Sequence, residues 1–163
     1  MKIDVLILMG SESDATIMSA ARDTVLEFGL TCEMTVASAH RSPVRVLRLV
    51  GEAPPRGVKV FIVGAGAAAH LAGVVAAHTT LPVIGVPIDS SALKGMDALL
   101  STVQMPPGVP VATVAIGRAG AINAGVLAAQ MIALGDPLLA GRLVDYKKKL
   151  ADKVDEAATR LEQ

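Results

Sequence analysis

Five short, mostly apolar runs alternate with segments of helical spacing along this chain of 163 residues. The runs have the length of strands and occupy residues 5–9, 33–37, 58–63, 82–87 and 112–116. Strands that are apolar throughout, without a regular alternation of polar and apolar residues, are typical of a parallel sheet covered on both faces. We therefore expect an α/β fold, a three-layer α/β/α sandwich around a five-stranded parallel sheet, with 2-1-3-4-5 as the expected strand order.

Helical segments with glycine or proline stop signals separate these runs. The expected helices run from about 14 to 28, 44 to 53, 70 to 77, 95 to 103, 119 to 134 and 137 to 161. The helix over 119–134 is apolar on nearly all sides, so we expect a partner subunit to cover part of it. In the last helix we expect Leu143, Leu150, Val154 and Leu161 to pack, with the charges outside, at a subunit interface. No linker separates a second domain, so residues 1–163 are predicted to form one domain with its core in 3–134.

Composition excludes several classes of protein. The chain carries 15 basic and 15 acidic side chains, so its net charge is zero and no basic face for nucleic acid is evident. Polar residues interrupt every apolar run before the roughly 18 residues that a membrane span needs. Cys32 is the only cysteine, which excludes an internal disulfide and a cysteine-based zinc site. The N-terminus opens into a strand-like run instead of a signal peptide, so we expect a cytoplasmic protein.

Polar side chains follow three of the predicted strands at their carboxyl ends. The first two loops carry Ser11, Ser13 and Asp14, then Ser38, His40 and Arg41, and the third carries a glycine-rich run and His70. With strand one between strands two and three, these loops converge where open parallel sheets bind ligands. Arg41 and the hydroxyls can hold a phosphate, and Asp14 can accept hydrogen bonds from a sugar diol. The pattern predicts a site for a nucleotide monophosphate, with the imidazoles near its base.

Each of these residues also has a purely structural interpretation. Ser11 or Ser13 can be a helix N-cap, and Asp14 can interact with the helix dipole. Arg41 can be a surface cation, and His70 can cap a helix or lie half-buried. The convergence of the loops, more than any single residue, supports the site.

A second motif gives a competing hypothesis. Residues 64–69 (GAGAAA) match the G-x-G-x-x-A dinucleotide fingerprint, and Asp89 follows about 20 residues later, near the end of the next strand. In dinucleotide-binding domains the fingerprint lies in the first strand-to-helix turn, whereas here it follows the third strand. A dinucleotide-binding regulatory module is therefore kept as the alternative from another class.

Several ordered motifs resemble those of the N5-carboxyaminoimidazole ribonucleotide mutases, the bacterial class of the PurE family of de novo purine biosynthesis. They are 10–14 (GSESD), 38–43 (SAHRSP), 65–73 (AGAAAHLAG), 81–87 (LPVIGVP) and 104–111 (QMPPGVPV). The resemblance implies a flavodoxin-like fold, a homo-octamer, and an isomerase that needs neither metal nor cofactor. Such an enzyme moves a carboxylate from the exocyclic N5 to ring carbon C4. The alternatives with similar chemistry are a direct carboxylase that uses carbon dioxide and a paralogue acting on another ribonucleotide.

The resemblance also implies roles for individual residues. His40 and His70 match the catalytic histidines, with His40 as general acid and base and His70 at the base end of the pocket. The residues implied to bind substrate are Ser11, Ser13, Asp14, Ser38, Arg41, Gly66, Ala67, Ala68 and Leu71. Of these, the glycine-rich loop and Leu71 are implied to hold the migrating carboxylate through backbone amides.

This chain departs from the usual family pattern at four positions, Ala15, Ala67, Ala72 and Val74, where Val74 replaces a methionine. Ala15 replaces a bulky residue, and Ala72 replaces a proline that would stiffen the loop. Ala67 replaces a glycine, so it adds a Cβ where we expect a positive φ or a close approach of the backbone to the ligand. The catalytic side chains are unchanged by these departures.

Overall fold

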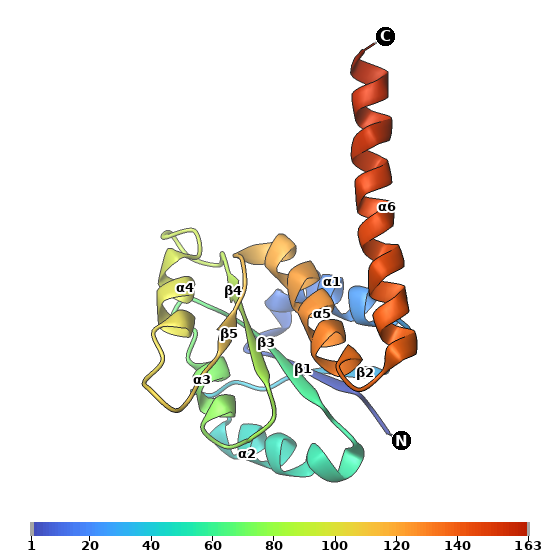
Figure 1. Ribbon diagram of the computed structural model, residues 1–163. Helices are drawn as coiled ribbons and strands as arrows, with labels where there is room; N and C mark the ends of the chain where they lie inside the picture. Colours follow the sequence, from blue (N-terminus) through green and yellow to red (C-terminus); the bar gives the residue numbers. More distant parts are fainter. Residues whose placement is uncertain (1, 163) are drawn as a thin grey trace.

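A five-stranded parallel sheet forms the centre of the computed structural model, which describes residues 2–162 (Figure 1). Its strands are β1 Val5–Met9, β2 Cys32–Val36, β3 Val60–Gly66, β4 Val83–Ile88 and β5 Ala112–Thr113. Their order in the sheet is 2-1-3-4-5, which confirms the predicted architecture. The predicted bounds were wrong by one to three residues at most strand ends, and two differences stand out. Strand β3 continues to Gly66, because Gly66 pairs with Ile88 of β4. Strand β5 is only two residues long.

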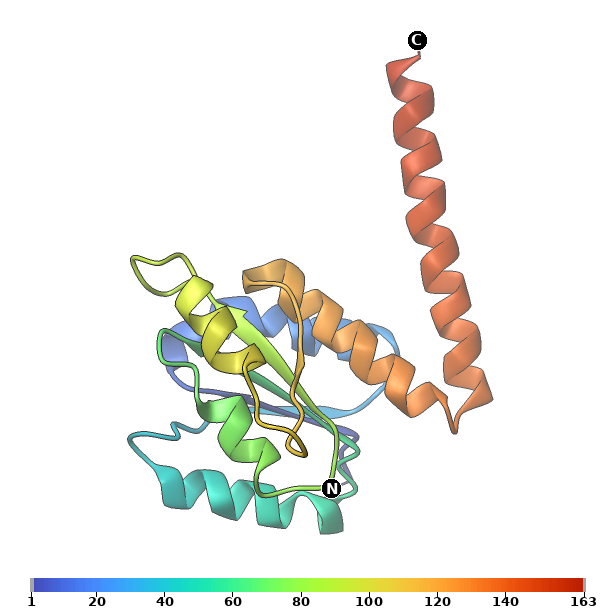
Figure 2. The ribbon, with the colours of Figure 1, turned by 60° about the vertical axis from the view of Figure 1, so that its left-hand side comes forward.

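Helices cover both faces of the sheet (Figures 1 and 2). Their bounds are α1 Ala15–Glu27, α2 Pro43–Glu52, α3 Leu71–Ala76, α4 Met96–Val103, α5 Gly117–Ala133 and α6 Pro137–Leu161, with short 3-10 turns at Glu12–Asp14 and Pro54–Arg56. Helices α1 and α5 pack together on one face, and α2 and α3 lie on the other. Each predicted helix is present, although α3 begins only at Leu71, after the glycine-rich loop. Ala72 lies within α3, inside the predicted helix, and is buried, so it is not part of the loop that a proline at this position was expected to stiffen.

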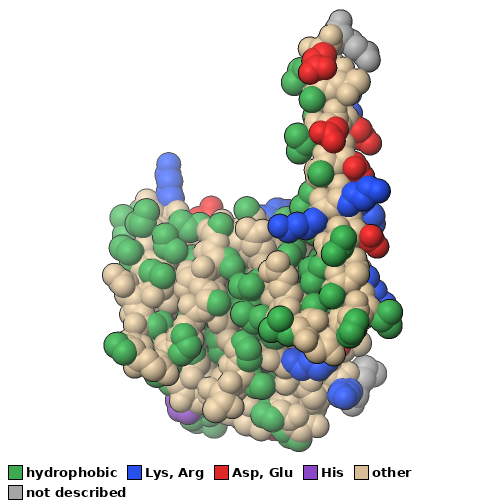
Figure 3. Space-filling model, viewed as in Figure 1, with side chains coloured by type: hydrophobic (Ala, Val, Ile, Leu, Met, Phe, Trp, Pro, Cys, Tyr) green, Lys and Arg blue, Asp and Glu red, His purple; other side chains and the backbone are tan. Residues whose placement is uncertain are grey.

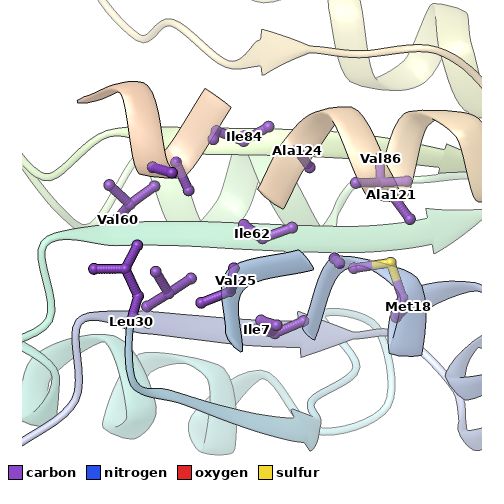
Figure 4. Close-up of a cluster of buried hydrophobic side chains, with 14 of the residues drawn as sticks. Ile7, Met18, Val25, Leu30, Val60, Ile62, Ile84, Val86, Ala121 and Ala124 are labelled. Carbon is purple, nitrogen blue, oxygen red and sulfur yellow. The ribbon is translucent and has the colours of Figure 1, made fainter. Parts of the chain in front are cut away.

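The side chains of β1 explain why this strand is apolar throughout. Val5, Ile7 and Met9 pack with α1 and α5, in the cluster drawn in Figure 4, whereas Leu6 and Leu8 pack with α2 and α3. Successive side chains of a strand point to opposite faces, so a central strand covered on both faces has no polar positions. At about 1.5–3 kcal/mol for each fully buried large aliphatic side chain, this strand contributes strongly to stability.

Helix α6 projects from the body of the protein as an arm (Figures 1, 2 and 3). Its first turns are anchored to the body of the protein. Leu139 is buried, and Nη1 of Arg142 donates to the carbonyl of Phe28 at 2.7 Å. The ring centroids of Tyr146 and Phe28 are 5.2 Å apart. Beyond Tyr146 the helix has little contact with its own chain. Within residues 2–162, no helix combines the length and apolarity needed to cross a membrane.

The expected packing of α6 is therefore realised only in part within one chain. Leu143 is partly buried against the core formed with α1 and α5. Leu150, Val154 and Leu161 are instead 45, 68 and 88% exposed. Charged side chains share this part of the helix with apolar ones, as Figure 3 shows.

Candidate active site

The loop after β1 is organised by hydrogen bonds among Ser11, Ser13 and Asp14. The Ser11 amide donates to Asp14 Oδ2 at 3.1 Å, and the Ser11 hydroxyl accepts from the Ser13 amide and hydroxyl. This is a capping box at the start of the short turn before α1, so the structural interpretation of Ser11 is confirmed. Burial raises the pKa of the Asp14 carboxyl above its ordinary value, although the Ser11 amide, the Ser13 hydroxyl and Arg41 oppose that shift.

The loop after β2 places Arg41 against the loop after β1. Its Nη2 donates to the carbonyl of Gly10 at 2.7 Å, and its Nε and backbone amide both lie within 3.3 Å of the Ser38 hydroxyl. These contacts hold the guanidinium at the cleft while leaving further N–H donors for an anion. Ser38 therefore positions Arg41 in addition to lining the cleft.

The loop after β3 brings His70 onto His40. Nε2 of His40 lies 2.9 Å from Nδ1 of His70, and the rings meet nearly at right angles with centroids 4.9 Å apart. Both histidines are exposed. Ala67 in the same loop has a φ of 52°, so the positive φ that we expected at this position is confirmed. An L-residue with this backbone conformation is strained by its Cβ.

These three loops and the end of β4 enclose a cleft of about 260 Å³ at the carboxyl edge of the sheet. The predicted residues that line it are Ser11, Ser13, Asp14, Ser38, His40, Arg41, Gly66, Ala68 and Leu71. Ala67 and His70 do not line it, and His70 reaches it only through His40. Gly10, Ala39 and Ser90 also line the cleft and were not predicted, whereas Ala65 belongs to the glycine-rich loop that was expected there. For Ser90 the available signal was its place two residues after a central strand, at the edge where ligands bind.

The glycine motif does not form the turn of a dinucleotide-binding site. Gly64 and Gly66 lie inside β3, paired with Val86 and Ile88 of β4. A Cβ on Gly64 would lie within 3 Å of the Met18 side chain, so this glycine permits close packing of α1 on the sheet. A fingerprint glycine belongs in the strand-to-helix turn that approaches the pyrophosphate. The alternative of a dinucleotide-binding module therefore lacks its structural basis.

No metal centre is evident in the part of the chain that the structure describes. Among residues 2–162, no three side chains of His, Cys, Asp or Glu are grouped so that they could hold a metal ion.

A parallel sheet of order 2-1-3-4-5 with a polar cleft beyond β1, β2 and β3 defines a flavodoxin-like α/β protein with a ligand site at its carboxyl edge. More particularly, the chain belongs to the AIR carboxylase family, which matches residues 4–153.

Individual relatives agree with this assignment over nearly the whole chain. The chain is 51% identical to the N5-carboxyaminoimidazole ribonucleotide mutase of Brucella melitensis, covering 96% of both chains. It is 52% identical to the mutase of the same name from Bacillus subtilis, covering 95% of this chain and 96% of that one. The crystal structure of Treponema denticola PurE superposes with a TM-score of 0.87 at 29% identity and covers 98% of each chain.

Proposed function

We propose that this chain is an isomerase of de novo purine biosynthesis that converts N5-carboxyaminoimidazole ribonucleotide to 4-carboxy-5-aminoimidazole ribonucleotide. The relatives that carry the mutase name support the reaction, since they match about half of the residues over nearly the full length. The observation that carries the proposal is the arrangement of the cleft. Arg41 and His40 follow β2, Arg41 contacts the loop after β1, and His40 contacts the loop after β3.

Substrate binding follows from the chemistry of the cleft walls. The Arg41 guanidinium and the hydroxyls of Ser11, Ser13 and Ser38 hold the phosphate, which accepts hydrogen bonds only. Asp14 accepts hydrogen bonds from the ribose hydroxyls, since a carboxylate would repel the phosphate. The imidazole of the substrate then extends toward Gly66, Ala68 and Leu71, whose short or apolar side chains leave room for a flat ring.

His40 moves the proton in both halves of the reaction. Protonated His40 gives its proton to N5, the bond between N5 and the carboxyl carbon breaks, and carbon dioxide leaves. Ring carbon C4 then adds to the carbon dioxide, and the neutral His40 removes the proton from C4. Proton and charge balance is restored, and no further reactant is consumed. The apolar side chains of Ala65, Ala68 and Leu71 on one wall of the cleft favour retention of the carbon dioxide near C4.

His70 acts on the substrate through His40 and is a positioning residue in this scheme. The facing nitrogens of the two rings are 2.9 Å apart, a distance at which one must donate and the other accept. His70 thus orients the His40 ring and determines which of its nitrogens carries a proton.

We also propose that the chain forms one domain over residues 1–163 and assembles as a cytoplasmic homo-octamer. Exposed apolar side chains on the arm support contacts between subunits, with Leu150, Val154 and Leu161 as the clearest examples. The number of subunits rests on the family resemblance. A net charge of zero supports a small-molecule partner over nucleic acid.

The reaction is tested by supplying N5-carboxyaminoimidazole ribonucleotide to the purified protein without bicarbonate. We expect the 4-carboxy isomer to form, and His40→Asn to abolish its formation while substrate binding stays measurable by calorimetry. A protein that instead needs bicarbonate and aminoimidazole ribonucleotide is the direct carboxylase. Full activity of His40→Asn contradicts the proposed mechanism, and tight binding of NAD without ribonucleotide binding contradicts the proposed function.

A further inference from the structure

Ser90 lies at the carboxyl end of β4 and lines the cleft beside the glycine-rich loop. Its side chain covers the α-carbon of Gly66, because a Cβ built on Gly66 would lie 1.8 Å from the Ser90 hydroxyl oxygen and 2.9 Å from the Ser90 Cβ. Gly66 therefore has to be glycine for Ser90 to occupy this position. The paired ends of β3 and β4 fix both residues, since Gly66 pairs with Ile88.

The neighbouring Ser91 shows what a serine with a structural role looks like in the same loop. Its hydroxyl donates to Asp97 Oδ2 at 2.7 Å and accepts from the Leu93 amide at 3.1 Å. Within residues 2–162 the Ser90 hydroxyl has no such partner and is exposed. The hydroxyl of Ser90 is therefore available to a ligand, whereas that of Ser91 holds the loop.

The carboxylate next to Ser90 in the sequence does not repel an anionic group of the ligand. Asp89 does not face the cleft, because its Oδ1 lies 3.4 Å from the position of a Cβ on Gly117, at the start of α5. The positive end of the helix dipole offsets its charge there. Ser90 is thus a side-chain hydrogen-bond donor on a wall otherwise formed by Ala65, Gly66, Ala68 and Leu71.

Strand order places Ser90 away from the phosphate-binding side. Arg41 follows β2 and Ser90 follows β4, and these strands are three positions apart in the sheet, about 14 Å at the usual strand spacing. A ribonucleotide whose phosphate lies at Arg41 consequently extends its heterocycle toward Ser90.

We propose that the Ser90 hydroxyl is a substrate-binding group that donates a hydrogen bond to the carboxylate attached to the imidazole ring. This inference rests on the proposed function, because it takes the carboxylated ribonucleotide as the ligand. It adds a specificity contact, since a ribonucleotide without the carboxylate offers Ser90 no charged acceptor.

The test compares two ligands by calorimetry, 4-carboxy-5-aminoimidazole ribonucleotide and 5-aminoimidazole ribonucleotide, with the unaltered protein and with Ser90→Ala. We expect Ser90→Ala to weaken binding of the carboxylated ligand roughly tenfold and to leave binding of the other ligand nearly unchanged. The ratio of the two losses is the measured quantity. A ratio of about threefold or more supports the role of Ser90, and a smaller one overturns it.

Ser91→Ala is the matched control, because it removes a hydroxyl from the same loop that does not line the cleft. We expect it to affect both ligands equally. If it reproduces the selective loss, the loop and not the Ser90 hydroxyl is responsible, and the inference is overturned. Circular dichroism confirms that each variant is folded. An unaltered protein that binds neither ribonucleotide contradicts the proposed function itself, whereas normal binding with an unselective Ser90→Ala contradicts only the role of Ser90.

Discussion

The Nε2 atom of His40 lies 2.9 Å from the Nδ1 atom of His70, and the two rings meet edge to face. The loops after β2 and β3 are neither adjacent in sequence nor attached to neighbouring strands, because β1 lies between β2 and β3. The contact therefore spans β1 at the carboxyl edge. At this distance one of the two facing nitrogens donates a hydrogen bond and the other accepts it, so the contact links the tautomers of the two rings.

Replacing His70 with Asn should lower kcat about tenfold to a hundredfold, because His40 loses the partner that orients it while remaining chemically intact. KM should change little, since His70 does not line the cleft. Steady-state kinetics over a range of pH measure both, and the shape of the pH profile should change as well. His78→Asn is the control, because the His78 ring is also exposed, is hydrogen-bonded to the carbonyl of Val74 and does not line the cleft. An unchanged kcat and pH profile in His70→Asn would show that the pair has no role in proton transfer.

Replacing Ala67 with Gly should raise the free energy of unfolding by about 0.5–1 kcal/mol. The left-handed conformation costs an L-residue about 1–2 kcal/mol, and the greater freedom of glycine in the unfolded chain offsets part of the gain. Urea unfolding measures the difference. Ala68→Gly is the matched control, because Ala68 is also exposed but does not have a positive φ. Its free energy of unfolding should be unchanged or lower than that of the unaltered protein. Equal effects in the two variants would mean that the strain at Ala67 does not limit stability.

The sheet could be predicted well from the sequence, because the run of apolar residues that marks each buried strand is a local feature of the chain. An uninterrupted apolar run such as 5–9 has to be covered on both sides, and only helices on both faces of a parallel sheet provide that. The same reasoning missed Ser90, because a serine after a strand is also an ordinary loop residue. Its significance depends on contact with Gly66 across two paired strands, and sequence spacing does not reveal that contact.

The prediction for α6 was only partly correct for a different reason. Helical periodicity identifies the apolar face formed by Leu143, Leu150 and Val154, but it does not say which surface covers that face. Within one chain the covered part ends near Tyr146, because α5 and α1 extend no farther along the arm. Amphipathic spacing thus predicted a helix and its apolar face, while the partner of that face depends on tertiary or quaternary structure.

Replacing Asp14 with Asn should raise the melting temperature at neutral pH, because the buried carboxyl has a raised pKa and its charged form is disfavoured in the folded protein. A raised folded pKa means that the folded state holds the proton more tightly than the unfolded state. The charged carboxylate therefore destabilises the folded state fully at a pH above the raised pKa. This destabilisation disappears as the pH falls to the pKa of Asp in the unfolded chain, about 4. Thermal melts between acidic and neutral pH should show the advantage of the Asn variant shrinking as the pH falls. A difference that does not depend on pH would show that ionisation of Asp14 is not its cause.

The same substitution, Asp14→Asn, should weaken ribonucleotide binding, since a neutral amide lacks the charge that strengthens hydrogen bonds from sugar hydroxyls. Calorimetry with the ribonucleotide measures this effect separately from stability. Asp145→Asn, on the exposed side of α6, is the control and should alter neither quantity.

Replacing Leu150 and Val154 together with Asp should reduce the size of the assembly while leaving the subunit folded. Both side chains are exposed in the single chain, so their loss costs the isolated fold little, whereas charges on a buried interface are strongly unfavourable. The contacts that anchor α6, formed by Leu139, Arg142 and Tyr146, are left intact. Light scattering coupled to size-exclusion chromatography measures the mass, and circular dichroism measures the fold.

Lys149→Asp with Lys153→Asp is the matched control, because it introduces the same side chain on exposed positions of the same helix that carry charge already. Since the two pairs of positions interleave along the helix, a loss of assembly confined to the apolar pair would identify that face as the interface, and unchanged mass in both variants would show that the arm does not hold subunits together.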